Sequence, residues 1–276
     1  MMTAAEKYRL PVELNGTILQ QIITARLPEI ASAKQKLPAE SIRMVLDRAP
    51  QVRSLKRALR RRPGILAEIK RASPSAGLLC PNLDPAAIAG QYQKGGAAAI
   101  SVVTEANYFR GGLEILAALR WHTDLPLLRK DFIVDSYQVL ESRHAGADAV
   151  LLITALLERS LLRELRICAE ELGMDALVEV HNEGEMGRAL EAGSTLIGVN
   201  SRDLRSFDVA LDICARLAAG LPGEVTAVAE SGIRTVGDIR SLAKAGYRGF
   251  LIGEALMRAA SPQAKLAEFV SALEKG

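Results

Sequence analysis

The stretch Ala145-Gly146-Ala147-Asp148-Ala149-Val150-Leu151-Leu152-Ile153-Thr154 contains the pattern that decides the fold. Its second residue is a glycine, which tolerates the left-handed conformation just after a helix, and an apolar run rich in Val, Leu and Ile follows. Apolar runs without in-and-out alternation are typical of parallel strands that helices cover on the outside. The stretch therefore predicts the end of a helix followed by a buried parallel strand.

The same unit recurs along the chain. Seven further apolar runs lie at 65–69, 97–103, 125–128, 174–180, 195–199, 225–229 and 249–252. Eight strands that alternate with amphipathic segments favour a closed barrel over an open sheet. An open doubly wound sheet usually has a GxGxxG motif after its first strand, and here Ile69-Lys70-Arg71-Ala72-Ser73-Pro74 stands in that place. We therefore predict an α/β protein with a single (β/α)8 TIM barrel.

About 60 residues precede the first predicted strand. Apolar side chains in this part fall at helical spacing, at Ile18, Ile22, Ile23, Leu27 and Ile30. They predict an extra helix against the barrel, and the basic run at 56–62 is interpreted as a solvated helix face. The full length of 276 residues, 49% of them apolar, suits one barrel of roughly 250 residues with an addition. We expect one domain over 1–276, with an N-terminal helical extension at 1–63 and the barrel at 64–276.

Composition excludes several classes of protein. The formal net charge is +3, and the basic residues are interspersed with acidic ones, which argues against a nucleic-acid partner and weakly favours a small anionic substrate. Cys80, Cys168 and Cys214 show no CxxC spacing, so we interpret them as core or helix residues in a reducing cytoplasm. Residues 1–7 lack the pattern of an export signal, and no run of about 18 apolar residues occurs. We expect a soluble cytoplasmic protein without a membrane partner.

Polar residues end or interrupt most of the predicted strands. They are Glu68, Lys70, Glu105, Lys130, Asp131, Glu179, Asn200, Ser201, Arg202, Glu230, Ser231, Gly253 and Glu254. Barrel enzymes of this kind carry out their chemistry at the C-terminal ends of the strands. Any single one of these residues could be an ion pair that only packs the barrel. Together they predict one charged pocket with several candidate acids and bases.

Some of these polar residues are better explained without catalysis. Glu105 is interpreted as ordering the loop that follows it, and Asp131 and Asp203 as capping or pairing locally. His122 and His144 fall near predicted helix ends, and His181 is a weak candidate to line the mouth. No HxH or HExxH motif is present, so we expect no metal and no other cofactor. A lysine that forms a Schiff base, Lys70 or Lys130, stays open as an alternative.

The last two strand ends predict a phosphate site. Glycines follow both of them, in Ala229-Glu230-Ser231-Gly232-Ile233 and in Leu251-Ile252-Gly253-Glu254-Ala255. Glycine lets backbone N–H groups approach a ligand, and a following helix N-terminus favours an anion. Ordinary tight turns are the alternative explanation of these glycines. The pair of motifs predicts a phosphorylated substrate without identifying it.

Five segments closely resemble the indole-3-glycerol-phosphate synthase family, with matching order and spacing from about residue 15 to the end. They are 65–75, 128–133, 177–181, 197–204 and 229–233. The resemblance implies a (β/α)8 barrel with an N-terminal helix over its mouth. The motifs of the last two strands alone also resemble phosphoribosylanthranilate isomerase. Ala72, Ala76 and Ala255 depart from residues common in the family, which bears on loop motion and phosphate contacts.

The resemblance implies a reaction and a set of roles. The substrate would be 1-(2-carboxyphenylamino)-1-deoxyribulose 5-phosphate, converted without a cofactor to indole-3-glycerol phosphate with loss of carbon dioxide and water. A lysine suits ring closure because an ammonium can protonate the ketone oxygen as negative charge develops on it. We therefore assign ring closure to Lys130, and the dehydration to Glu179 and Lys70. Glu68 and Glu230 would orient the lysines and the sugar hydroxyls.

Further residues would bind the substrate. Arg202 with Asn200 suits the anthranilate carboxylate, because a guanidinium offers a bidentate fork. The phosphate would be held by Ser231, Gly232, Gly253 and the backbone of Glu254, with help from Lys70. The remaining expected binding residues are Ser73 and an apolar wall for the anthranilate ring made by Pro74, Phe109 and Phe132. The small residues after Lys70 suggest a mobile cover.

Two other functions stay open. One is a phosphosugar isomerase similar to phosphoribosylanthranilate isomerase, which would need an acid/base pair but no arginine for a carboxylate. The other is a non-catalytic, phosphate-binding barrel, which the full ring of polar residues disfavours. For assembly we expect a monomer or a weak homo-oligomer.

Overall fold

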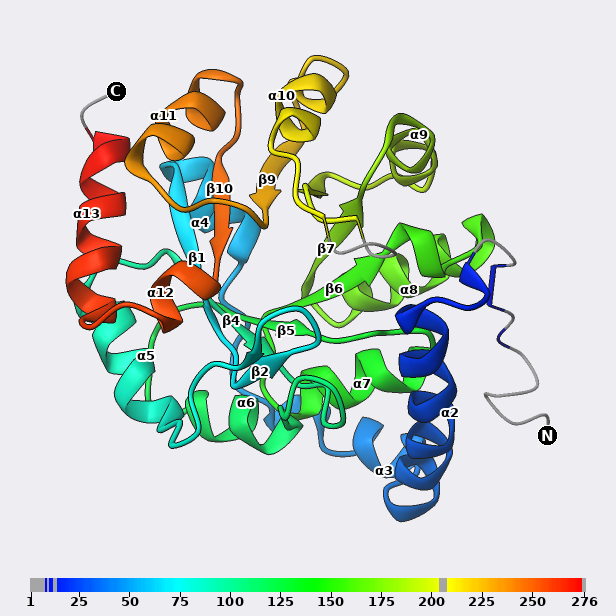
Figure 1. Cartoon of the computed structure of the whole chain (residues 1–276). Helices are drawn as coiled ribbons and strands as arrows, with labels where there is room; N and C mark the ends of the chain where they lie inside the picture. The colour runs from blue at the N-terminus through cyan, green and yellow to red at the C-terminus, as the bar shows by residue number, and fades with distance from the viewer. Residues whose placement is uncertain (1–7, 9, 12–13, 204–207, 275–276) are drawn as a thin grey trace.

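The computed structural model describes residues 8, 10–11, 14–203 and 208–274 (Figure 1). Two sequence interpretations, on residues 1–7 and on Leu204, therefore lie outside the described residues. Eight parallel strands close into a barrel in the order β1-β10-β9-β8-β7-β6-β5-β4. These strands are β1 (Gly64–Ile69), β4 (Ala99–Val103), β5 (Leu127–Lys130), β6 (Ala149–Ile153), β7 (Asp175–Val180), β8 (Leu196–Asn200), β9 (Thr226–Glu230) and β10 (Gly249–Ile252). The predicted (β/α)8 barrel is confirmed.

Each predicted apolar run overlaps one of these strands, and nearly every strand residue is buried. The largest shift in bounds is at β5, which was expected at 125–128 and ends at Lys130. Val102 and Val103 of β4 pair with Arg129 and Lys130, which extends the ladder over two charged residues. The chain tolerates this because Arg129, fully buried, forms ion pairs with Asp131 and Glu141.

Helices follow the strands and surround the barrel (Figure 1). They are α5 (Pro85–Lys94), α6 (Leu113–Leu119), α7 (Ser136–His144), α8 (Arg159–Glu171), α9 (Glu183–Glu191), α10 (Asp212–Ala218), α11 (Val236–Lys244), α12 (Glu254–Met257) and α13 (Pro262–Glu274), with a 3-10 turn η3 (Thr154–Leu156). Gly146, expected just after a helix, has positive φ, and so do Gly96, Gly193 and Gly246 in the same place of other units. They end the helices and turn the chain into the next strand.

The N-terminal part forms helices α2 (Ile18–Lys36), α3 (Ala39–Arg43) and α4 (Leu55–Arg61), with a 3-10 turn η2 (Leu46–Arg48). Helix α4 lies at the N-terminal end of the barrel, where its Leu59 comes close to Gly64 and Gly249, the first residues of β1 and β10. Its arginines Arg57, Arg60 and Arg61 are exposed, as expected for a solvated face. Helix α2 is the predicted extra helix, and it packs beside α7 (Figure 1).

The strand register brings the polar strand ends to one rim of the barrel. Asn200 at the end of β8 pairs with Glu230 at the end of β9, and Glu179 of β7 pairs with Ile153 at the end of β6. After β1 the chain forms a short antiparallel hairpin of β2 (Ala72–Ser73) and β3 (Gly77–Leu78) beside this rim. None of the helices in the described part of the chain has the length and apolar character of a membrane span.

Candidate active site

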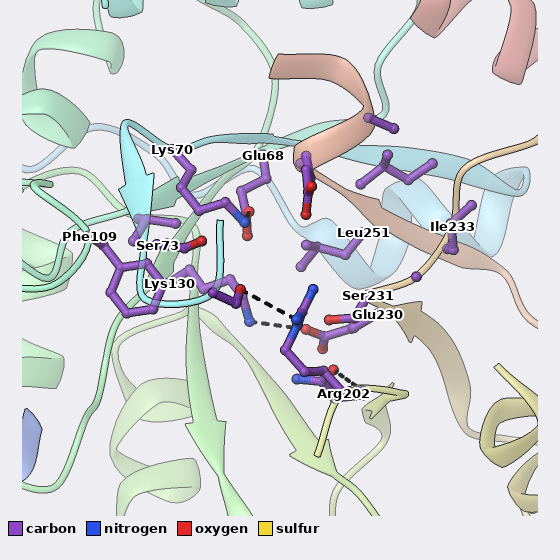
Figure 2. A pocket seen from close by; sticks show the side chains of 18 of the residues that line it. Glu68, Lys70, Ser73, Phe109, Lys130, Arg202, Glu230, Ser231, Ile233 and Leu251 are labelled. Atoms are coloured by element: carbon purple, nitrogen blue, oxygen red, sulfur yellow. Dashed lines mark hydrogen bonds and ion pairs between the residues drawn. The ribbon is translucent and has the colours of Figure 1, made fainter. Parts of the chain in front are cut away.

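A cavity of about 420 Å³ opens at the C-terminal ends of the barrel strands (Figure 2). All fifteen residues predicted for the site line it. They are Glu68, Lys70, Ser73, Pro74, Phe109, Lys130, Phe132, Glu179, Asn200, Arg202, Glu230, Ser231, Gly232, Gly253 and Glu254. The structure thus brings the predicted residues together, while the role of each one stays a prediction.

Lys130 lies at the centre of the charged groups. Its Nζ is 3.1 Å from Oε2 of Glu179 and 3.1 Å from Oε2 of Glu230. The side chain of Lys130 is 19% exposed, whereas those of Glu179 and Glu230 are 2% and 1% exposed. Burial alone would lower the pKa of Lys130, but Glu179 and Glu230 hold it well above its usual value. Lys130 is therefore a cation at neutral pH, with N–H bonds available to a ligand in the cavity.

The two carboxyls beside Lys130 differ in their surroundings, and their pKa values move apart. Burial and the neighbouring Glu179 raise the pKa of Glu230 to about 7, against the attraction of Lys130. For Glu179, burial is outweighed by Lys130, His181 and Asn200, which hold its pKa well below the usual range. Glu179 is accordingly ionised at neutral pH, whereas Glu230 changes its charge near neutrality. Divergent pKa values in adjacent carboxyls are typical of acid and base pairs in active sites.

His181 lies between the carboxyl groups of Glu179 and Glu185. Its Nδ1 is 2.9 Å from Oε2 of Glu185, and its Nε2 is 3.2 Å from Oε1 of Glu179 in an ion pair without hydrogen-bond geometry. Burial would lower the pKa of His181, but the carboxylates of Glu179 and Glu185 raise it to about 10. His181 is thus a cation with a 12% exposed side chain, outside the set of cavity-lining residues, and the prediction that it lines the mouth is wrong. Its charge explains part of the acidity of Glu179.

Lys70 enters the cavity from the end of β1. Its Nζ is 2.5 Å from Oε1 of Glu68, and its side chain is 17% exposed. A Cβ placed on Gly253 would lie 2.2 Å from the same carboxylate oxygen, so glycine at the end of β10 leaves room for this pair. The segment after Lys70, expected as a mobile cover, contains the hairpin of β2 and β3, and Ala72 N–H donates to the carbonyl of Phe109. Motion of this hairpin stays a prediction.

Two aromatic rings form one wall of the cavity. Phe109 and Phe132 have ring centroids 6.1 Å apart with 43° between the ring planes. Glu105 orders the loop of Phe109, because its carboxylate accepts hydrogen bonds from the backbone N–H groups of Asn107, Tyr108 and Phe109. The interpretation of Glu105 as a loop-ordering residue is confirmed. An aromatic wall of this kind can pack against a flat ring.

The opposite side of the cavity is lined by residues at the ends of β9 and β10. Ser231 and Gly232 both have positive φ, 66° and 72°, and such backbone is costly for a serine. A Cβ on Gly232 would lie 2.5 Å from a side-chain carbon of Val209, so only glycine fits. Successive residues with positive φ beside a cavity can present backbone N–H groups to an anion.

Three cations near this side were missed by the sequence reasoning. Arg234, Arg258 and Lys265 also line the cavity. Arg234 lies three residues after Ser231 and could have been found by extending that motif. Arg258 was signalled by its i,i+4 spacing to Glu254, with which it forms a 3.1 Å ion pair. Lys265 comes from α13, and no local signal connects it to the site.

Arg202 reaches the cavity from just beyond β8. Its backbone N–H donates to Oδ1 of Asn200, and its Nη1 is 3.4 Å from Oγ of Ser75 in the hairpin loop. Asn200 in turn donates from Nδ2 to Oε1 of Glu179 at 3.0 Å. Arg202 and Asn200 are therefore held next to each other, and Asn200 is bonded to a carboxylate that pairs with Lys130. A guanidinium in this place can form a bidentate pair with a ligand carboxylate.

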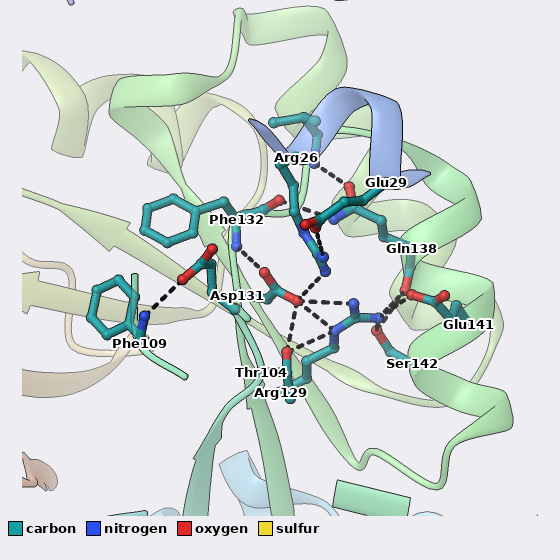
Figure 3. A network of polar contacts seen from close by, with 12 residues as sticks. Arg26, Glu29, Thr104, Phe109, Arg129, Asp131, Phe132, Gln138, Glu141 and Ser142 are labelled. Atoms are coloured by element: carbon teal, nitrogen blue, oxygen red, sulfur yellow. Dashed lines mark hydrogen bonds and ion pairs between the residues drawn. The ribbon is translucent and has the colours of Figure 1, made fainter. Parts of the chain in front are cut away.

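Asp131 pairs more widely than expected. It was predicted to pair locally, and it does so with Arg129 at 2.9 Å, but Arg26 of α2 also contacts it at 2.6 Å (Figure 3).

Across the residues that the structure describes, no three His, Cys, Asp or Glu side chains form a group able to hold a metal ion. The chemistry that this cavity can supply with its own residues is proton transfer and the binding of anionic groups.

Comparison with known proteins identifies the family. The family model described as indole-3-glycerol phosphate synthase matches residues 19–269. Proteins named indole-3-glycerol phosphate synthase are 46% identical in Laribacter hongkongensis (91% of this chain, 97% of that protein), 48% in Carboxydothermus hydrogenoformans (88% and 96%) and 46% in Mycobacterium tuberculosis strain H37Rv (93% and 95%).

Solved structures support the fold alone. The 3-hexulose-6-phosphate synthase from Salmonella typhimurium aligns with a TM-score of 0.63 at 14% identity, over 77% of this chain and 99% of that one. The thiamine phosphate pyrophosphorylase from Pyrococcus furiosus aligns with a TM-score of 0.59 at 19% identity, over 80% and 98%. Sequence relatives of 46–48% identity over nearly their whole length, together with the family model, are decisive. The chain belongs to the indole-3-glycerol phosphate synthase family.

Proposed function

We propose that this chain closes the indole ring of 1-(2-carboxyphenylamino)-1-deoxyribulose 5-phosphate, releases carbon dioxide and water, and forms indole-3-glycerol phosphate. Family membership supplies the reaction. The observation that carries the site assignment is the position of Lys130 between Glu179 and Glu230. Phe109 and Phe132 line one side of the same cavity, and Ser231 and Gly232 line the other. The cavity thus offers a distinct place for each part of this substrate.

We assign the ends of the substrate first. The phosphate is held by Ser231, Gly232, Gly253 and the backbone of Glu254, and the surplus of cations on that side favours its two negative charges. The anthranilate ring packs between Phe109, Phe132 and Pro74, near Ser73. Its carboxylate is bound by Arg202 beside Asn200. With both ends fixed, the ring carbon and the ketone carbon are held as neighbours, which lowers the entropic part of the barrier.

Lys130 is the proton donor in ring closure. As the ring carbon attacks the ketone carbon, the carbonyl electron pair moves to oxygen, and the Lys130 ammonium donates a proton to it. The pKa of Lys130 is raised because Glu179 and Glu230 stabilise its charge, so it carries the required proton at neutral pH. Loss of carbon dioxide from the same ring carbon then returns the bonding electrons to the ring and restores its aromaticity.

Dehydration needs an acid and a base. The hydroxyl formed in ring closure leaves as water when an ammonium donates a proton, and a carboxylate removes a proton from the substrate. Lys70, paired with Glu68, serves as the acid, and Glu179, whose pKa is held well below its usual range, serves as the base. Glu68 and Glu230 orient the two lysines and the sugar hydroxyls.

Domain organisation, assembly and location are further parts of the proposal. We propose that the chain acts as one domain over 1–276, with a helical extension at 1–63 on a barrel at 64–276, because α2, α3 and α4 pack against the same core as the strands. We also propose a monomer or weak homo-oligomer in the cytoplasm, where the three free cysteines would stay reduced.

The test compares two substrates of similar charge. Purified full-length protein is mixed with the carboxyphenylamino substrate and, separately, with phosphoribosylanthranilate, and indole fluorescence is followed. The proposed function predicts an indole signal from the first compound only and no consumption of the second. Consumption of phosphoribosylanthranilate would instead support the isomerase, and no turnover of either would support a non-catalytic barrel.

A further inference from the structure

Helix α2 reaches the rim of the cavity through one arginine (Figure 3). Nη2 of Arg26 donates to Oδ2 of Asp131 at 2.6 Å, and Nη1 donates to Oε2 of Glu29 at 2.6 Å. The side chain of Arg26 is only 12% exposed, and that of Asp131 is fully buried. Asp131 follows Lys130 directly in the chain, so the helix is fixed to a strand end that carries a cavity residue.

Asp131 also has partners in the barrel. Its Oδ2 already accepts from Arg129 at 2.9 Å and from Oγ1 of Thr104 at 2.6 Å. Its Oδ1 accepts from the backbone N–H of Phe132 at 2.8 Å. The carboxylate therefore fixes the backbone at Phe132, and Arg26 adds a link between that fixed backbone and α2.

Glu29 extends the same link to a second segment. Its Oε1 accepts from Nδ2 of Asn107 at 2.7 Å, while its Oε2 accepts from Arg26. Asn107 belongs to the loop between β4 and α6, whose backbone is held by Glu105 up to Phe109. One turn of α2 is thus bonded to both segments that present the aromatic wall.

We propose that Arg26 and Glu29 are positioning residues for the aromatic ring of the substrate. Through Asp131 and Asn107 they hold Phe132 and Phe109 in the relative placement seen in the structure, with ring centroids 6.1 Å apart. The inference rests on the proposed function, which takes the carboxyphenyl ring as the group that these phenylalanines contact. It assigns part of the substrate specificity to a helix that supplies no residue to the cavity lining described above.

The test measures ring-dependent affinity in two variants. Arg26→Met removes both ion pairs of Arg26, and Asn107→Ala removes only the bond from Glu29 to the exposed end of the loop. The ligands are the non-reactive reduced substrate analogue and ribulose 5-phosphate, which lacks the ring. We expect each variant to bind the analogue about 2- to 10-fold more weakly, because well-oriented aromatic pairs strengthen binding by about that factor. The affinity for ribulose 5-phosphate and the value of kcat should stay nearly unchanged.

Lys34→Met is the matched control. Lys34 also links α2 to the barrel, but by a 2.7 Å ion pair with Asp135 and not through Asp131 or Asn107. It should leave the affinity for both ligands unchanged. Variants that bind the analogue as well as Lys34→Met does, or that lose both ligands equally, would overturn the proposal. If Arg26→Met fails to fold, Asn107→Ala decides alone. A wild-type protein that neither turns over the substrate nor binds the analogue would instead refute the proposed function.

Discussion

Replacing Lys130 with methionine separates its two tasks, proton donation and charge balance. At 3.1 Å and an effective dielectric constant of about 20, each attraction between Lys130 and a carboxylate amounts to about 5 kcal/mol before desolvation is subtracted. Breaking a buried pair typically costs about 3–5 kcal/mol net, because the remaining charge stays buried. Lys130→Met should therefore be strongly destabilised while it also loses the ring-closure acid.

The loss of activity has a separate scale. A general acid contributes about 10² to 10⁴ in rate, so kcat should fall by that range while the affinity for the reduced substrate analogue changes little. Single-turnover kinetics give the rate, and calorimetric titration with the analogue gives the affinity. The variant should also be least stable at high pH. The folded-state pKa of Glu230, already raised to about 7, rises further without Lys130, so folding takes up a proton there and stability falls as pH rises above about 4.5.

The double variant Lys130→Met/Glu230→Gln is the control. It removes one carboxylate together with the cation, so stability should recover while turnover does not. Near-normal kcat in Lys130→Met would refute the assignment of the acid, and so would a loss confined to affinity. Recovery of turnover together with stability in the double variant would show that Lys130 only balances charge.

Four further predictions concern single residues and one additive. Arg202→Ala should weaken binding of the reduced analogue by about 1.5–3 kcal/mol, because the carboxylate loses its fork; unchanged affinity would remove Arg202 from the site. Lys70→Met should both slow turnover and weaken binding of inorganic phosphate, and a variant that loses only one of these would contradict its double role. The folded pKa of His181 is raised to about 10, so its stabilising charge is fully present below about pH 6.5 and is lost as pH rises through 10. Between pH 7 and pH 10 the free energy of unfolding should therefore fall more steeply in the wild type than in His181→Gln, as urea titrations at each pH would show; parallel curves would count against a charged His181. Turnover should survive a chelator, because Lys130 supplies the positive charge at the reacting oxygen; activity lost with chelator and restored by one divalent metal would defeat this.

The barrel was predictable because its strands are buried on both faces. Their sequences are mostly apolar without in-and-out alternation, and glycines such as Gly146 mark the helix ends in front of them. The candidate site followed from the same pattern, since a polar residue at the end of an apolar strand, such as Glu179, has to lie at the rim or be paired. The apolar runs thus predicted the fold, and the polar residues at their ends predicted the position of the cavity.

What could not be predicted depends on contacts between distant segments. The pair of Arg26 with Asp131 joins residues 105 positions apart, and Asp131 was accordingly expected to pair only locally. The different pKa values of Glu179 and Glu230 arise from burial and from the placement of His181, which has no signature in the sequence. Lys265 reaches the cavity from the last helix, far from any strand end.

The most direct test of the central claim follows the fate of the substrate carboxylate. The carboxyphenylamino substrate, labelled with carbon-14 in its carboxyl group, is mixed with excess purified full-length protein in a single turnover, and labelled carbon dioxide and indole fluorescence are measured together. One molecule of labelled carbon dioxide is expected for each indole-3-glycerol phosphate, with both signals slowed together by about 10² to 10⁴ in Lys130→Met. Conversion of the substrate to a product that retains the label would contradict it.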